Sequence, residues 1–415
     1  MSKLVFYEVK KLFHRKGICF LLLCMILLPP FFVPKLDEHN HNYMVSDSSG
    51  NPIRGYELTA IEDKSLSLYK GNLLEKELSL RIDHDFEIND ILSEVDPNKV
   101  IERYGKKLSY EELYQKIDEI DERLFYEEAD HNRYNYFSSI THKLYHLKAS
   151  LTVDNYSSYF INRANSPEEE NIRKEIYAKK LNTSKVYVDN IYGFRQLFST
   201  LNIVSFILSF FFLFLMPSIF SEECRHKMLR LLKTTKEGKR RVGLAKVITV
   251  VLLSIAIPLI SILFTTLVIY LRYGLQNWNV SATLIGNQNM LYSMFGYYIR
   301  RMLLMIVGCL GMSVIGAFLS SMISNSYVSL GILIVYYICW MFWTSGTGYI
   351  DWRTFTPMHI LSDSGTTVLG SGVFLIQNHM ISLERILHIF WMVVTIVLLG
   401  LSYIAYQKRQ VTNES

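Results

Sequence analysis

The chain has 415 residues, of which half are hydrophobic and only 20% are charged. Residues 35–197 hold 22 Lys and Arg against 30 Asp and Glu, a net charge of −8, whereas the rest of the chain carries +13. A soluble domain carries about 25% charged residues, and here the basic residues border hydrophobic runs, so the composition argues against both a single soluble globule and a nucleic-acid binder.

Six apolar runs are long enough, or nearly long enough, to cross a bilayer, which takes about 20 helical residues. They cover residues 17–34, 199–220, 247–271, 302–323, 328–343 and 386–406. The turn-like residues 324–327 predict a tight helical hairpin between the fourth and fifth runs. A signal peptide is the alternative for the first run. Because that run ends in Val-Pro-Lys rather than in small residues, we interpret it as an uncleaved span.

The distribution of basic residues predicts that both termini lie in the cytoplasm. In this orientation the short inside segments hold 16 Lys and Arg in 55 residues, and the short outside loops hold 5 in 70. The exceptions are Arg300 and Arg301, which we place at the outer end of the fourth span. None of the five cysteines lies in residues 35–197, which fits a bacterial surface domain without disulfides. We therefore expect a multi-pass protein of the bacterial cytoplasmic membrane.

The fold class predicted is mainly α: six transmembrane helices and an α-rich or α+β extracellular domain. Residues 1–34 form an amphipathic N-terminal helix and the first span, residues 35–197 the extracellular domain, and residues 198–415 the other five spans. In the extracellular domain, apolar residues at helical spacing predict an antiparallel hairpin over 110–151, and Ser166-Pro167 predicts the start of a helix over 167–182. That helix could continue into the second span. Residues 45–100 could supply a few strands.

Histidines in the outside block offer a metal-binding alternative. His39 and His41 follow the first span beside Asp37 and Glu38, and the spacing of two further histidines, His142 and His146, puts them on one helical face. Neither group matches a defined site. We interpret both as ordinary surface residues and assign no metal ligands.

The loop after the second span, residues 221–241, predicts an amphipathic helix. Ser221 can cap this helix, and Glu222 and Glu223 lie in its first turn. The apolar residues Cys224, Met228, Leu231 and Leu232 fall on one face, and the opposite face is basic. One interpretation is a basic loop that fixes topology and touches anionic membrane lipid. The other is a docking helix for a cytosolic partner.

The loop resembles the coupling helix of ABC-2 type transporter permeases. The resemblance rests on a Glu soon after the second span, Leu231-Leu232, Thr234-Thr235, a basic cluster and Ala245-Lys246 before the third span. It extends to the layout of the chain, with a basic amphipathic helix over residues 2–15, six spans and a large outside insertion after the first. That insertion is similar to the one in members that export drugs, sodium, lipids or peptides.

The resemblance implies a permease subunit of an ABC exporter that moves a peptide, drug, lipid or ion. A cytosolic ABC ATPase subunit would dock on residues 221–241, and a second permease copy or a sister permease would complete the path. The expected docking residues are Glu222, Glu223, Met228, Leu231, Leu232 and Thr235. Gly238-Lys239 lacks the upstream glycine of a phosphate-binding loop, so we expect ATP and Mg²⁺ on the partner subunit and no cofactor on this chain.

The fourth span carries small residues at intervals of four: Cys309, Ser313, Ala317 and Ser321, with Gly308, Gly311, Gly316 and Ser320 nearby. Small residues let helix backbones approach closely, so this stripe predicts a packing seam. The partner helix lies in the same subunit or in a second one, and we favour the same subunit. Pro217 and Pro258 are expected to bend the second and third spans.

An enzyme is not expected. No nucleophile elbow is present, and no Asp, Glu, Lys or Arg lies in the middle of a span, which also argues against an ion-coupled transporter. The alternative from another functional class is a polytopic surface receptor or scaffold. Its extracellular domain would bind a ligand, and it would neither transport nor need an ATPase.

Overall fold

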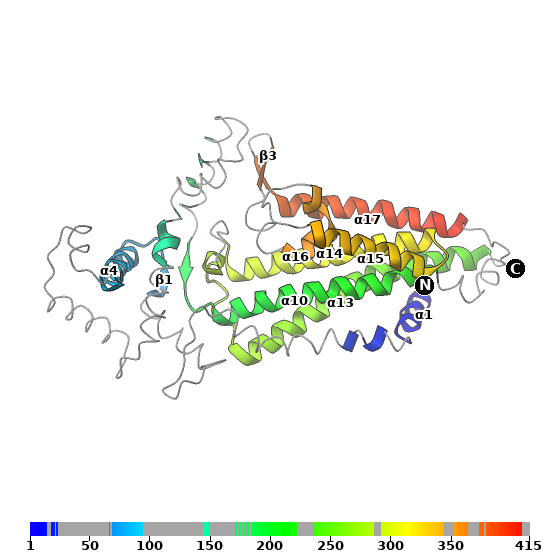
Figure 1. Cartoon of the computed structure of the whole chain (residues 1–415), viewed down its shortest axis with the longest axis horizontal. Coiled ribbons are helices and arrows are strands. Elements are labelled where there is room, and N and C mark those ends of the chain that lie inside the picture. The colour runs from blue at the N-terminus through cyan, green and yellow to red at the C-terminus, as the bar shows by residue number, and fades with distance from the viewer. Residues whose placement is uncertain are drawn as a thin grey trace. The chain divides into compact units, whose positions relative to one another are not determined.

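The computed structural model describes most of the apolar part of the chain and a smaller share of residues 35–184. The described residues are 1–14, 18–20, 22–23, 66, 69–93, 144–149, 151, 171, 174–175, 178–179, 181, 185–221, 236–285, 292–343, 352–363, 373–376 and 379–408. They form a mainly α structure, as the composition predicts (Figure 1).

The helices and strands follow one another in a simple order (Figure 1). The α-helices are α1 (Ser2–Phe13), α4 (Lys76–Ser93), α10 (Tyr192–Leu215), α13 (Lys236–Tyr273), α14 (Met294–Met322), α15 (Ser326–Trp343), α16 (Pro357–Asp363) and α17 (Leu383–Lys408). The 3-10 helices are η2 (Met216–Ser218), η3 (Ala282–Ile285) and η4 (Trp352–Phe355). The strands are β1 (Gly71–Asn72), β2 (Tyr187–Val188), β3 (Val373–Ile376) and β4 (His379–Ser382).

Four helices are long and apolar enough to cross a membrane. They cover Tyr192–Ser218, Arg240–Tyr273, Met294–Met322 and Leu383–Lys408, and correspond to the predicted second, third, fourth and sixth spans. The predicted fifth span is the shorter helix α15, apolar over Ser326–Trp340. Most of the first predicted span lies outside the described residues. The chain is therefore a multi-pass membrane protein, with at least four such helices among its described residues.

The ends of these helices follow from local chemistry. The α-helix of α10 stops at Leu215 and gives way to η2, which contains Pro217, because proline cannot donate the next helical hydrogen bond. Pro258, in contrast, lies inside the continuous helix α13. Helix α15 begins after Asn325, whose side-chain oxygen accepts the backbone N–H of Tyr327 at 2.9 Å. The predicted hairpin between α14 and α15 is thereby confirmed.

The described structure divides into two compact units, and the first is a helical unit. It contains Met1–Val33, Leu197–Val268 and Tyr298–Ser415. Helix α14 contacts both α13 and α17. The hydroxyl groups of Tyr298 on α14 and Thr266 on α13 form a hydrogen bond of 2.9 Å. On the side of α17, a Cβ atom added at Gly311 would lie 3.0 Å from the ring of Trp391. Large apolar side chains are exposed on α13, α15 and α17, as expected for helices that face hydrocarbon.

The second unit contains Pro34–Gln196 and Ile269–Tyr297. It therefore includes part of the predicted outside loop between the third and fourth spans. Strands β1 and β2 pair antiparallel, with Gly71 opposite Val188, and the N–H of Ser281 donates to the carbonyl of Tyr187 at 2.9 Å. The side chain of Asp189 pairs with Lys70 at 3.2 Å and accepts a hydrogen bond from Asn277. These contacts tie residues 269–297 to the strands of this unit.

Two local expectations in the second unit have different outcomes. Residues 45–100, expected to be mixed and to supply a few strands, contain β1. Residues 76–93, within the region expected to be mixed, form the helix α4, where the hydroxyl of Tyr69 donates to the buried Asp85 at 2.7 Å. The helix expected over 167–182 does not continue into the second span, because residues 185–191 are non-helical and contain β2. Of the predicted hairpin over 110–151, residues 144–149 are described and helical.

Candidate functional site

The predicted docking residues lie outside the described structure. Glu222, Glu223, Met228, Leu231, Leu232 and Thr235 all fall within residues 222–235. The two ends of this loop are described: the chain enters it at Ser221 and leaves it at Lys236, where α13 begins. The structure therefore shows how the base of the loop is built.

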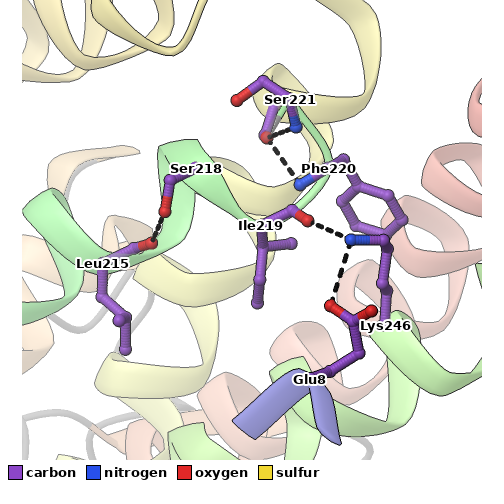
Figure 2. Close-up of polar contacts among 8 residues, drawn as sticks. Glu8, Leu215, Ser218, Ile219, Phe220, Ser221 and Lys246 are labelled. Carbon is purple, nitrogen blue, oxygen red and sulfur yellow. Dashed lines mark hydrogen bonds and ion pairs between the residues drawn. The ribbon is translucent and has the colours of Figure 1, made fainter. Parts of the chain in front are cut away.

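At the loop base, residues from α1, α13 and α14 meet the short segment 219–221 that follows η2. We define this loop-base junction as Glu8, Ile219, Phe220, Ser221, Lys246 and Ser320. Figure 2 labels all of these residues except Ser320. All six residues are buried.

Lys246 lies at the centre of the junction. Its ammonium group Nζ donates to the backbone carbonyl of Ile219 at 2.6 Å and to Oε2 of Glu8 at 3.2 Å (Figure 2). The Lys246 side chain is 0% exposed and that of Glu8 is 9% exposed. A buried charge is costly unless it is paired and hydrogen-bonded, so these two acceptors hold the ammonium group in one place. Removing one partner of such a pair costs about 3–5 kcal/mol in other proteins.

A serine on α14 fastens the chain just before the loop. The Oγ atom of Ser320 accepts the backbone N–H of Phe220 at 3.0 Å and that of Ser221 at 3.2 Å. Both donors come after the proline-containing 3-10 turn η2. The Ser221 hydroxyl donates to the carbonyl of Pro217 at 2.8 Å. The entry to the loop is therefore held by hydrogen bonds to its backbone.

Aromatic packing completes the junction from the side of α17. The ring centroids of Phe220 and Tyr406 are 5.5 Å apart, and Nζ of Lys246 lies 5.8 Å from the Phe220 ring. On α13, Gly243 lies so close to α17 that an added Cβ would be 3.1 Å from Tyr406. The absence of a side chain at Gly243 allows α13 and α17 to approach on this side.

Replacing Ser320 by alanine is expected to loosen the loop entry. The change leaves two buried backbone N–H groups without their acceptor, and each such loss costs about 1–3 kcal/mol. We expect a lower unfolding temperature in detergent and faster amide hydrogen exchange at Phe220 and Ser221. Ser362→Ala is the matched control, since Ser362 is exposed and its hydroxyl only donates to the carbonyl of His359. Equal exchange in the two variants would contradict this role of Ser320.

The predicted small-residue seam of α14 is buried within the single chain. Cys309, Ser313, Ala317 and Ser321 are each at most 2% exposed. The neighbouring glycines show which elements come close: a Cβ at Gly308 would lie 2.7 Å from Leu361 of α16, and one at Gly316 would lie 2.7 Å from Met216 of η2. These contacts favour packing within the subunit, the first of the two alternatives.

Arg300 and Arg301 lie inside α14, seven and eight residues along the helix. Arg300 pairs with Glu384 of α17 at 2.6 Å. Arg301 is 2% exposed and donates to the side-chain oxygen of Asn202 on α10. Neither residue needs to reach outward to water, because each meets a polar partner on a neighbouring helix. The two arginines connect α14 to α10 and α17.

Sequence reasoning missed the pairing of Glu8 with Lys246. Glu8 is the single acidic residue in an otherwise basic segment, residues 1–16, and Lys246 directly precedes the apolar run of the third span. The charge of each residue is unusual for its surroundings, and both residues could have been singled out from the sequence for that reason. Their pairing, however, depends on α1 packing against α13. Of the four histidines in the metal alternatives only His146 is described, and its neighbours include Phe86 and Tyr145; the other three lie outside the described residues.

Comparison with models of protein families gives a match that covers nearly the whole chain. Residues 17–405 match the family described as ABC-2 family transporter protein. No curated protein and no solved structure matches the chain significantly.

Proposed function

Because the chain belongs to the ABC-2 family of transporter proteins, we propose that it is the permease subunit of an ABC exporter. Membership of this family makes it a membrane component of an ABC transporter, one that associates with a cytosolic ABC ATPase and leaves ATP hydrolysis to that subunit. The proposal adds the direction, the docking segment and the class of cargo.

The observation that carries the proposal is the extent of the family match. It covers residues 17–405 and so includes the amphipathic loop at 221–241 as well as the candidate spans. In this proposal, the loop lies in the cytoplasm and the ATPase subunit contacts its apolar face, including Met228, Leu231 and Leu232. Glu222, Glu223 and Thr235 complete the contact. ATP binding then favours one arrangement of the spans, and hydrolysis resets it.

The loop-base junction supports this proposal by its construction. Movement of the loop would displace Ser221, the residue that directly precedes it. The backbone N–H of Ser221 is hydrogen-bonded to Ser320 of α14. On its other side, the loop continues directly into α13. Coupling between distant sites requires packed elements that move together, and both ends of the loop are attached to spans in this way.

The cargo that we propose is a peptide, a drug, a lipid or an ion, moved outward across the bacterial cytoplasmic membrane. Two permease subunits, either two copies of this chain or this chain and a sister permease, would form the path. Both termini would lie in the cytoplasm, and the domain of residues 35–197 outside the cell.

The proposal is tested by changing the loop and measuring ATP hydrolysis. The chain is produced together with its ATPase subunit, purified in mild detergent and reconstituted into liposomes. Glu222→Gln and the double variant Leu231→Ala/Leu232→Ala are expected to insert normally and to abolish permease-dependent stimulation of ATPase activity, because they remove the docking face. The matched control is Ile396→Ala/Val397→Ala, which truncates two adjacent exposed apolar residues of α17.

Two results would contradict the proposal. The first is unchanged ATPase stimulation in the loop variants at equal amounts of inserted protein. The second concerns the side of the membrane: in a background without the native cysteines, Lys236→Cys should resist a membrane-impermeant maleimide in intact cells. Labelling of that cysteine would place the loop outside, where no ATPase subunit could reach it.

A further inference from the structure

The N-terminal helix α1 is held at the loop base by a buried polar contact. Glu8 is the residue of α1 that reaches Lys246, and Leu12, one turn further along the helix, is 1% exposed. The other side of α1 is open, with Phe6 70% exposed and Tyr7 60% exposed. The helix is therefore attached to the helical unit through the face that carries Glu8 and Leu12.

One ammonium group connects the chain just before the loop to the helix that follows the loop. Ile219 lies before the loop, and Lys246 lies ten residues after the first residue of α13. Nζ of Lys246 donates to the carbonyl of Ile219 at 2.6 Å, and the same atom extends this connection to α1 through Glu8. Displacement of residues 219–221 or of α13 therefore acts on the Lys246 side chain, and through it on α1.

Placing a charged side chain at the buried position 246 costs free energy. Lys246 is 0% exposed, and an apolar side chain of similar volume in a helical bundle is often as stabilising as a buried ion pair. Apolar contacts such as that of Leu12 already hold α1 in place. What an apolar residue at 246 could not do is bond to the Ile219 carbonyl and to α1 at once. The polar contact thus fixes orientation between three segments.

We propose that Glu8 and Lys246 are positioning residues for energy coupling, which make α1 move together with residues 219–221 and α13 when the ATPase acts. This inference rests on the proposed function. Neither residue contacts the ATPase subunit in this scheme. They act by keeping α1, residues 219–221 and α13 in a fixed relation, so that movement of the loop is passed to the spans rather than absorbed at its base.

The test separates docking, coupling and folding by three measurements on the full permease–ATPase complex in liposomes. They are the amount of ATPase subunit bound, the maximal ATPase rate per bound subunit and the unfolding temperature of the permease. The variants are Glu8→Gln, Glu8→Lys, Lys246→Glu and the exchange Glu8→Lys/Lys246→Glu. Lys10→Gln is the matched control, because Lys10 is an exposed charged residue on the same helix.

We expect the Glu8 variants to bind the ATPase subunit as the unchanged chain does, since residues 222–235 are intact. The maximal rate per bound subunit should fall about tenfold, an ordinary magnitude for coupling between sites. Glu8→Lys and Lys246→Glu each place like charges together and should lower the unfolding temperature. The exchange restores opposite charges and should recover most of the rate. Lys10→Gln should keep the rate of the unchanged chain.

Two outcomes would overturn the inference. One is a Glu8→Lys variant that inserts, binds the ATPase subunit and keeps the full rate. The other is an exchange variant that regains its unfolding temperature but not its rate, since the pair would then serve stability alone. Failure of the proposed function shows differently, because the unchanged chain itself would not stimulate ATP hydrolysis, or the loop variants would keep full stimulation.

Discussion

Gly193→Ala is expected to lower the stability of the chain more than alanine at Gly274, Gly316, Gly331 or Gly400. A Cβ at Gly193, near the start of α10, would overlap the backbone carbonyl oxygen of Gly274. A rotamer change cannot relieve this overlap, since both partners are backbone groups. The loop after α13 would have to move, which strains the neighbouring contacts of Phe194 with Trp278 and of Asp189 with Asn277.

We expect Gly193→Ala to cost about 3 kcal/mol or more, at the upper end for overpacked sites. The measurements are accumulation in the membrane and thermal unfolding in detergent. Gly274→Ala is the informative companion. Gly274 follows α13 with a φ of +70° and has open space around its missing Cβ, so alanine there pays only the left-handed backbone cost of about 1–2 kcal/mol. A Gly193→Ala variant no less stable than Gly274→Ala would contradict the close approach of the two backbones.

Gly316→Ala is expected to disturb the contact that positions the loop entry. Its added Cβ would lie 2.7 Å from Cβ of Met216, and both atoms are attached directly to backbone. Met216 opens the 3-10 turn that leads to Ile219 and Ser221. Relieving the overlap therefore requires α14 or this turn to shift. We expect a loss of about 1–3 kcal/mol and, if the loop couples to the ATPase, a lower maximal rate of stimulated hydrolysis.

Two other helix glycines provide matched controls for Gly316→Ala. Gly331 on α15 and Gly400 on α17 have no atom within 4 Å of the position a Cβ would occupy. Alanine at either position should be neutral or stabilising by about 0.5–1 kcal/mol, because glycine in a helix costs more conformational entropy. Thermal unfolding of the three variants in the same detergent checks the contrast. A stabilised Gly316→Ala variant would show that η2 does not approach α14 this closely.

The buried junction and the loop have different parts in the proposed mechanism. The loop supplies the surface that a cytosolic ATPase subunit would contact, and its apolar residues are predicted from periodicity. The junction supplies the attachment, through hydrogen bonds from Ser320 and Lys246 to residues 219–221. Variants of the loop should therefore impair docking, whereas variants of the junction should impair the transfer of movement after docking.

Hydropathy and short motifs were enough to indicate which segments can cross the membrane and which family the chain resembles. Hydropathy is a local property, since each apolar residue in a span adds to insertion whatever its neighbours are. The four long apolar helices were predictable for this reason, and the turn-like residues 324–327 predicted the hairpin at Asn325. The small-residue stripe of α14 was equally legible, because close helix packing needs small side chains at regular intervals.

Which polar residues meet depends on how the helices pack and could not be predicted from local patterns. Glu8 and Lys246 are 238 positions apart, and Arg301 reaches an asparagine 99 positions away. The sequence placed Arg301 at the end of a span, while the structure buries it against α10. It likewise showed that residues 269–297 belong with the second unit. Such pairings depend on which helices become neighbours. Once these polar groups are buried, pairing is strongly favoured, because an unpaired polar group in an apolar interior costs several kcal/mol.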